Sequence, residues 1–141
     1  MLAISLSEEE FKWLRKKKAY EGENWVAIRI YSQLDEVSYL SKKFNDQFEE
    51  ILISQFTDIQ DEVEENGKIY QPFSEDNYKE IIEFVTKHQD CDKLFVHCHA
   101  GVCRSAGVAV GLAKKFDWIE SQHGLDGRTP VYPYPNVVSW F

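Results

Sequence analysis

Short runs of apolar residues, many of them β-branched or aromatic, recur along the chain and predict buried strands. They cover Leu2–Leu6, Trp25–Tyr31, Ile51–Phe56 and Lys93–Val96. The runs are nearly continuous rather than alternating with polar residues. This is typical of strands that are covered on both faces.

Segments with apolar residues at helical spacing separate these runs. Ser7 is placed to cap a helix that continues to Lys18. Glu10 would complete a capping box with Ser7, and Leu6 and Phe11 are spaced as a hydrophobic staple.

Further helices are expected to begin at an Asp35 cap and at a Ser74 cap, and another to cover Ala106–Phe116. Phe73 and Tyr78 form a second staple pair. The helix from Asp35 has an apolar stripe of Val37, Leu40, Phe44 and Phe48. The helix from Ser74 has one of Tyr78, Ile81, Ile82 and Val85. The segment from Asp117 is rich in Gly and Pro and predicts mostly loop, with at most one turn of helix at its end.

This alternation predicts an α/β fold with a mainly parallel central sheet flanked by helices. The 141 residues are expected to form one domain, residues 1–141. Ligands of such sheets bind beyond the carboxyl ends of the strands. A binding site is therefore expected at the residues that follow Val96.

Composition narrows the class of protein. The formal net charge of −8 disfavours nucleic acid as a partner. Three cysteines without paired spacing favour a reducing compartment, so we expect a cytoplasmic location. The first residues lack a secretory signal pattern, and no stretch of roughly 18 apolar residues predicts a membrane span.

The segment from His97 to Ser105 carries the strongest chemical signal, because it joins a predicted strand to a predicted helix through small residues. Such a loop points backbone N–H groups and the helix dipole at an anion. Cys98 is a candidate nucleophile, since a helix N-terminus lowers thiol pKa. Arg104 can fork two N–H bonds onto a tetrahedral anion.

Other residues of the loop have supporting roles in this interpretation. Gly101 lets the backbone approach the anion and can adopt positive φ. Ser105 can donate a hydrogen bond to the Cys98 sulfur, and His97 can hold the loop backbone. The anion would be bound by the residues His99, Ala100, Gly101, Val102, Cys103 and Arg104.

The pattern His-Cys-x5-Arg-Ser resembles the signature of the cysteine-dependent protein tyrosine and dual-specificity phosphatases, over roughly Ile51 to Asn136. The late position of the loop favours the compact dual-specificity branch. The low-molecular-weight tyrosine phosphatases and their arsenate reductase relatives have a similar loop, including a cysteine at the place of Cys103, but carry it near the N-terminus. The resemblance implies a three-layer sandwich and a phosphocysteine intermediate, with no cofactor.

Two other interpretations of the loop are weaker. His97, Cys98, His99 and Cys103, with or without Cys91, could hold zinc, but four ligands in seven residues do not match the paired spacings of such sites. If Cys98 were only a buried packing residue, the position of Arg104 directly after the loop would have no explanation.

The resemblance also requires an acid, an aspartate after another strand. Asp58 is the first carboxylate beyond Ile51–Phe56 and is our first choice, and Asp61 is the second. Both lie in an acidic run that could be merely solvated. The segment from Thr57 to Pro72 is long for a compact member, and we expect it to be a loop with Gly67 as a hinge. Asn136, in a Pro-Asn pair, is a supporting residue by resemblance.

The expected function is hydrolysis of phosphomonoesters, with phosphotyrosine in proteins as the first substrate and a phosphorylated protein or small phosphomonoester as the partner. No membrane partner is expected, and the oligomeric state is open. An RNA 5′-phosphatase, a phosphoinositide phosphatase and a non-catalytic pseudophosphatase are the alternatives. The absence of Lys and Arg from His99 to Cys103 argues against polyphosphoinositides.

Overall fold

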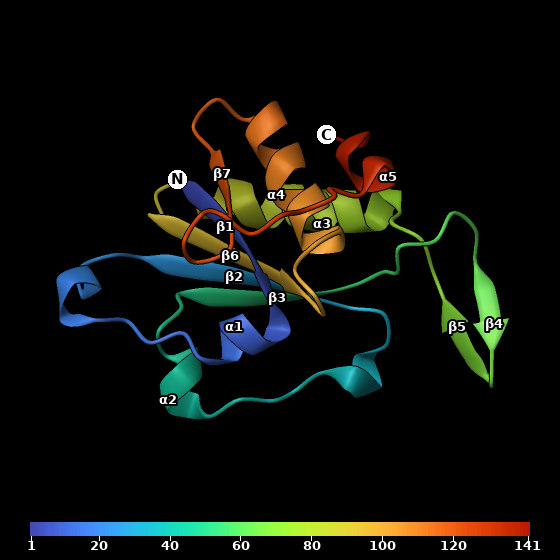
Figure 1. Ribbon diagram of the computed structural model, residues 1–141, viewed down its shortest axis with the longest axis horizontal. Helices are drawn as coiled ribbons and strands as arrows, with labels where there is room; N and C mark the ends of the chain where they lie inside the picture. Colours follow the sequence, from blue (N-terminus) through green and yellow to red (C-terminus); the bar gives the residue numbers. More distant parts are fainter.

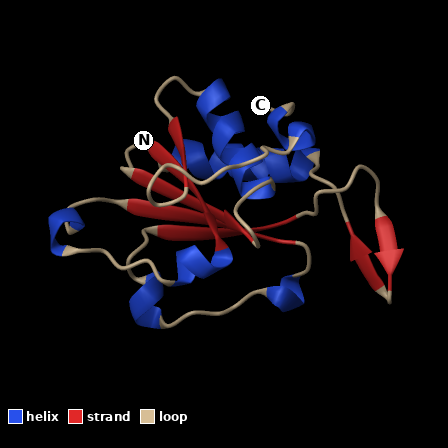
Figure 2. Ribbon diagram, in the orientation of Figure 1, coloured by secondary structure: helices blue, strands red, loops and turns tan.

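The computed structural model describes residues 1–141 and contains a five-stranded sheet of order β3-β2-β6-β1-β7 (Figures 1 and 2). Its strands are β1 (Leu2–Ser7), β2 (Trp25–Tyr31), β3 (Glu50–Gln55), β6 (Lys93–Cys98) and β7 (Glu120–His123). All neighbouring strands are parallel. The predicted α/β class with a mainly parallel sheet is confirmed.

Helices cover both faces of the sheet, which makes three layers (Figure 1). One face carries α3 (Glu75–Lys87), α4 (Arg104–Lys115) and α5 (Pro135–Val138). The other carries α1 (Glu8–Lys12) and α2 (Lys42–Asn45), and short 3₁₀ turns cover Lys18–Tyr20 and Leu34–Glu36. Alternate residues of β2 and β6 therefore enter two cores, which explains their continuous apolar runs.

Local capping explains where two helices begin. The Ser7 side chain accepts the Glu10 N–H, and the Glu10 carboxylate accepts the Ser7 N–H, as the sequence predicts. Ser74 caps α3 in the same way, with Asn77 as its reciprocal partner. Both Phe11 and Phe73 of the predicted staples are buried.

One predicted helix was wrong in extent, and another does not form. The helix after Ser7 ends at Lys12 rather than Lys18, because the basic residues after Leu14 offer no further apolar face to bury. The helix expected from Asp35 does not form. Instead, Ser41 caps the short helix α2, and Phe44 and Phe48 reach the core without a continuous helix between them.

The expected loop from Thr57 to Pro72 was also wrong, because it contains an antiparallel hairpin. Its strands are β4 (Val63–Glu65) and β5 (Lys68–Tyr70). Asn66 and Gly67 join them with φ of 53° and 78°, so Gly67 is a turn residue of the kind that hairpins require. The hairpin projects from the body of the molecule (Figure 1).

The segment after Asp117 is more ordered than its Gly and Pro content predicts. Its strand β7 pairs with β1, which is a correction to the expected loop. The single turn of helix expected near the end is present as α5. None of the helices has the length and apolar character needed to cross a membrane.

Candidate active site

The loop of residues 99–103 leaves the carboxyl end of β6 and enters α4 at Arg104. Strand β6 lies between β2 and β1 in the sheet. The loop therefore lies at the edge where parallel sheets place their ligands.

Cys98, the last residue of β6, is buried beneath this loop. Its Sγ accepts the Gly101 N–H at 3.2 Å and lies 3.2 Å from Ser105 Oγ. Burial alone would raise the pKa of the Cys98 thiol. The hydrogen bonds from Ser105 and Gly101 and the charge of Arg104 outweigh burial, so its pKa is lower than that of an ordinary thiol.

Ser5 of β1 lies behind this pair of residues. Its Oγ is 2.9 Å from Ser105 Oγ and 3.3 Å from the Gly101 carbonyl oxygen, and both serine side chains are buried. The single Ser5 proton can go either to the Gly101 carbonyl or to Ser105, and when it goes to Ser105, the Ser105 proton is directed at Cys98. Ser5 thus orients the group that contacts the sulfur.

Gly101 makes the close approach of the loop to β1 possible. Its φ is +73°, and a Cβ there would lie 2.4 Å from the Leu6 carbonyl carbon and the Ser7 nitrogen. The Glu8 N–H donates to the His99 carbonyl at 3.1 Å, which ties the loop to the start of α1. No side chain other than hydrogen fits at position 101 without movement of the backbone.

The backbone of the loop is arranged to receive an anion. None of the N–H groups from His99 to Cys103 donates to a backbone carbonyl. Gly101 donates to Cys98 Sγ instead. The remaining N–H groups of the loop, with the first turn of α4, are free to bind the oxygens of an anion.

His97 is completely buried and lies on the other side of the Cys98 backbone. Its Nδ1 donates to the Cys98 carbonyl at 3.0 Å, and its Nε2 accepts from Arg29 Nε at 2.9 Å. Burial, together with the nearby Arg29 charge, lowers the pKa of His97 to about 4. The neutral ring therefore holds the loop backbone, and both of its nitrogens are engaged, which leaves neither for the zinc alternative.

Arg29 is itself buried, although it lies in an apolar strand. Its Nη2 donates to Tyr31 Oη at 2.6 Å, and its Nη1 donates to the Ser38 carbonyl at 2.8 Å. Glu8 Oε2 lies 3.8 Å from Arg29 Nη2 and accepts from Tyr31 and Ser38. Burial and the hydrogen bond to Glu8 raise the pKa of Tyr31 to about 12, so the phenol stays protonated and bridges the two charges.

Arg104, the first residue of α4, extends across the same edge of the sheet. Its Nη1 donates to Ser32 Oγ at 2.9 Å and to the Phe56 carbonyl at 3.1 Å, just beyond β2 and β3. Nη1 is the donor in both hydrogen bonds. The other nitrogens of the guanidinium remain available for a bidentate contact with an oxyanion.

The two candidate acids differ in position. Asp58 and Asp61 are both exposed and follow β3. Burial, followed by the negative charge of Asp58, raises the pKa of Cys103 in the loop. The charge of Asp58 thus acts on the loop, whereas Asp61 is only two residues before the hairpin strand β4 in the sequence.

The segment before α5 also contacts the loop, through its backbone. Tyr132 N–H donates to the Val102 carbonyl at 2.9 Å, and Tyr134 N–H donates to the Cys103 carbonyl at 3.1 Å. Asn136 is exposed, and its side-chain amide donates to Tyr134 Oη at 3.0 Å. The contacts of this segment with the loop are thus made by the Tyr132 and Tyr134 backbone.

Comparisons with known proteins find only distant structural similarity. No family model and no curated protein matches the chain. A solved structure, "Crystal structure of Tk-PTP in the active form", is 17% identical and aligns over 82% of this chain and 68% of its own, with a TM-score of 0.48. At this level of similarity we infer the function from the chain's own residues.

Several residues of this site were not found by sequence reasoning. Ser5, Arg29 and Ser32 complete the surroundings of the loop. A signal existed for two of them, because Ser5 and Arg29 are polar residues in otherwise apolar strands. A buried polar residue generally has a specific partner, and here the partners are Ser105 and His97.

Proposed function

We propose that this chain is a phosphomonoester hydrolase of the cysteine-dependent phosphatase type, with phosphotyrosine in proteins as its substrate. The observation that carries the proposal is the position of Cys98 Sγ, which accepts a hydrogen bond from Gly101 and contacts Ser105 beneath the loop. The His-Cys-x5-Arg-Ser pattern supports the same assignment.

In the first step, the Cys98 thiolate attacks phosphorus in line. The S–P bond forms, and the bond from phosphorus to the leaving oxygen breaks. The loop N–H groups and Arg104 stabilise the equatorial oxygens, while Asp58 gives its proton to the departing phenolate.

In the second step, the Asp58 carboxylate takes a proton from water as the water oxygen attacks phosphorus. The S–P bond breaks, and inorganic phosphate leaves. Ser105 donates to the departing sulfur, which favours the thiolate as a leaving group. These steps need no metal ion or cofactor.

Turnover of para-nitrophenyl phosphate tests the proposal. Cys98→Ser should lower turnover to below about a hundredth of wild type and still bind phosphate or vanadate, since the loop N–H groups and Arg104 remain. Mass spectrometry of the quenched enzyme should find phosphate on Cys98.

Two outcomes contradict parts of the proposal. Phosphate binding without turnover in the wild-type chain would favour a pseudophosphatase. Activity on RNA 5′-phosphate or on phosphoinositides that exceeds activity on phosphotyrosyl peptides would overturn the substrate class.

A further inference from the structure

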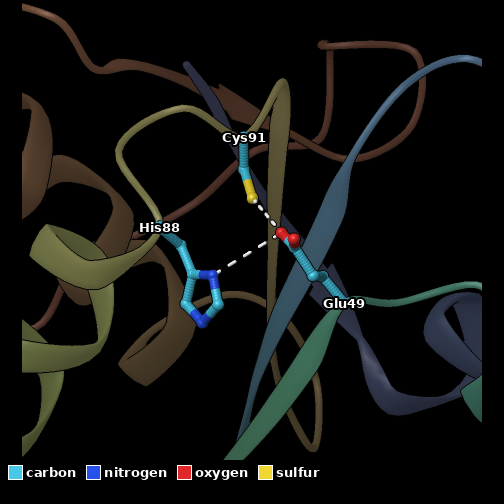
Figure 3. Close-up of side chains that lie close together, drawn as sticks. All are labelled: Glu49, His88 and Cys91. Carbon is cyan, nitrogen blue, oxygen red and sulfur yellow. Dashed lines mark hydrogen bonds and ion pairs between the residues drawn. The ribbon is translucent and has the colours of Figure 1, made fainter.

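Three potential metal ligands, Glu49, His88 and Cys91, converge at the amino-terminal edge of the sheet (Figure 3). Glu49 precedes β3, His88 ends α3, and Cys91 lies shortly before β6. This edge is opposite the one that carries Cys98. The Glu49–His88–Cys91 cluster thus shares no residue with the proposed phosphatase site.

The spacing of the ligand atoms fits a small tetrahedral cation. Glu49 Oε2 lies 3.1 Å from Cys91 Sγ and 3.6 Å from His88 Nδ1. All the candidate ligand atoms lie within 4.8 Å of one another. Zinc bonds of about 2.0–2.3 Å to oxygen, nitrogen and sulfur give tetrahedral edges of roughly 3.3–3.6 Å. Only small side-chain movements separate the cluster from that geometry.

The backbone at each of these residues is already fixed. Glu49 N–H donates to the Trp25 carbonyl at 2.7 Å, and Cys91 N–H donates to the His88 carbonyl at 2.9 Å. The side chains of His88 and Cys91 are buried, whereas that of Glu49 is 55% exposed. His88 and Cys91 are therefore held in place, and an ion can reach the cluster from solvent on the side of Glu49.

The second nitrogen of His88 is oriented as it is in metal sites. His88 Nε2 lies 3.2 Å from Glu50 Oε1, and Lys87 Nζ holds the same carboxylate oxygen at 2.9 Å. A histidine that binds a metal through one nitrogen usually donates the other N–H to a carboxylate. Here Nδ1 faces the cluster, and Nε2 is turned to Glu50.

We propose that Glu49, His88 and Cys91 bind a zinc ion, with water as the fourth ligand. A thiol and an imidazole together favour zinc over magnesium or calcium, which prefer oxygen. Binding replaces the Cys91 S–H bond to Glu49 with a zinc–sulfur bond and releases the thiol proton to solvent. The ion links α3 to the beginnings of β3 and β6, so it stabilises the fold at this edge.

Titration of metal-free Cys98→Ser protein with Zn²⁺ against a chromophoric chelator tests this site. The Cys98→Ser background removes the reactive thiolate as a competing ligand and needs no turnover, so the result is independent of the proposed function. We expect one zinc per chain and a rise in melting temperature with zinc. Cobalt in place of zinc should give a sulfur-to-cobalt charge-transfer band and the visible bands of a tetrahedral site.

Variants at the cluster should separate ligands from neighbours. Cys91→Ala and Glu49→Gln should each weaken zinc binding at least about tenfold, and Cys91→Ala should abolish the charge-transfer band. Glu50→Gln should lower the zinc affinity about 10- to 100-fold, because it removes the carboxylate that orients His88. Cys103→Ser and Glu64→Gln are the matched controls and should bind zinc as the Cys98→Ser background does.

Two results overturn the proposal. One is the absence of stoichiometric zinc binding. The other is a zinc affinity that does not change in Glu49→Gln. Because Glu49 is largely exposed, this variant keeps the fold and decides the question even where Cys91→Ala does not fold.

Discussion

Ser5 Oγ lies 2.9 Å from Ser105 Oγ, so the hydroxyl that contacts Cys98 is held by a buried residue from a different strand. Two hydroxyl groups in series, those of Ser105 and Ser5, therefore lie behind the Cys98 sulfur. Ser105 lowers the pKa of Cys98 through its contact with the sulfur, and Ser5 contacts Ser105 from behind.

Ser105→Ala should raise the pKa of Cys98 by about one to two units, because a hydrogen bond to a charged group contributes about 1.5–3 kcal/mol. The pH dependence of alkylation by iodoacetamide measures this. In wild type the midpoint should lie below the ordinary thiol value of about 8.5. Ser5→Ala should give a smaller shift in the same direction. An unchanged midpoint in Ser105→Ala would show that other groups stabilise the thiolate.

Asp58→Asn should slow hydrolysis of phenyl phosphate by roughly 10²–10⁴, the usual contribution of a general acid. The effect on para-nitrophenyl phosphate should be smaller, since that leaving group needs little protonation. Asp61→Asn is the control, with steady-state kinetics on both substrates. If only Asp61→Asn shows the dependence on leaving group, Asp61 rather than Asp58 is the general acid.

Gly101→Ala should destabilise the fold by more than about 2 kcal/mol, because it combines a positive φ with a collision against the Leu6 and Ser7 backbone. Gly67→Ala is the matched control. Its φ is +78°, but nothing lies within 4 Å of the added carbon, so about 1 kcal/mol is expected. Urea denaturation compares the two, and equal losses would exclude the close approach as the cause.

The free energy of unfolding should fall as pH drops from about 6.5 to about 4. The pKa of His97 in the folded chain, about 4, lies below its unfolded value of about 6.5, so the unfolded chain binds the proton more readily. This contribution is complete above pH 6.5 and amounts to roughly 3 kcal/mol. His97→Asn should show a weaker pH dependence in urea titrations than His99→Asn, at an exposed position. Parallel curves for the two variants would remove His97 as the cause.

Peroxide should inactivate the enzyme reversibly, through a disulfide between Cys98 and Cys103 in the same loop. Mass spectrometry of the oxidised protein should detect the bond. Relative to its own starting activity, Cys103→Ser should recover less than wild type after dithiothreitol. Equal recovery would leave Cys103 as a packing residue.

Sequence alone predicted the parts of the site that local rules determine. The sequence from Lys93 to Ser105 indicated a strand, an anion-binding loop and a helix, and the Ser7 and Ser74 caps follow from local hydrogen bonding. The hairpin at Asn66-Gly67 carried its usual turn signal, but the acidic residues around it lack the alternation that indicates strands.

Elements that depend on distant partners were not predictable in this way. β7 contains no apolar residue and is a strand because the edge of β1 is available to it. The contact of Ser5 with Ser105 joins positions 100 residues apart. The backbone contacts of Tyr132 and Tyr134 with the loop involve no side chain, so no residue type signals them.

The position of β1 between β6 and β7 influences the folding kinetics. This first strand pairs with β6 and β7, so Leu2 must meet both Lys93 and Glu120. Such distant pairings require the chain to close long loops before any contact compensates for the lost entropy. Folding should therefore be slow compared with helical proteins of this length. The pocket around Cys98 forms only when β1 docks beside β6, because Ser5 and the Leu6–Ser7 backbone complete its wall.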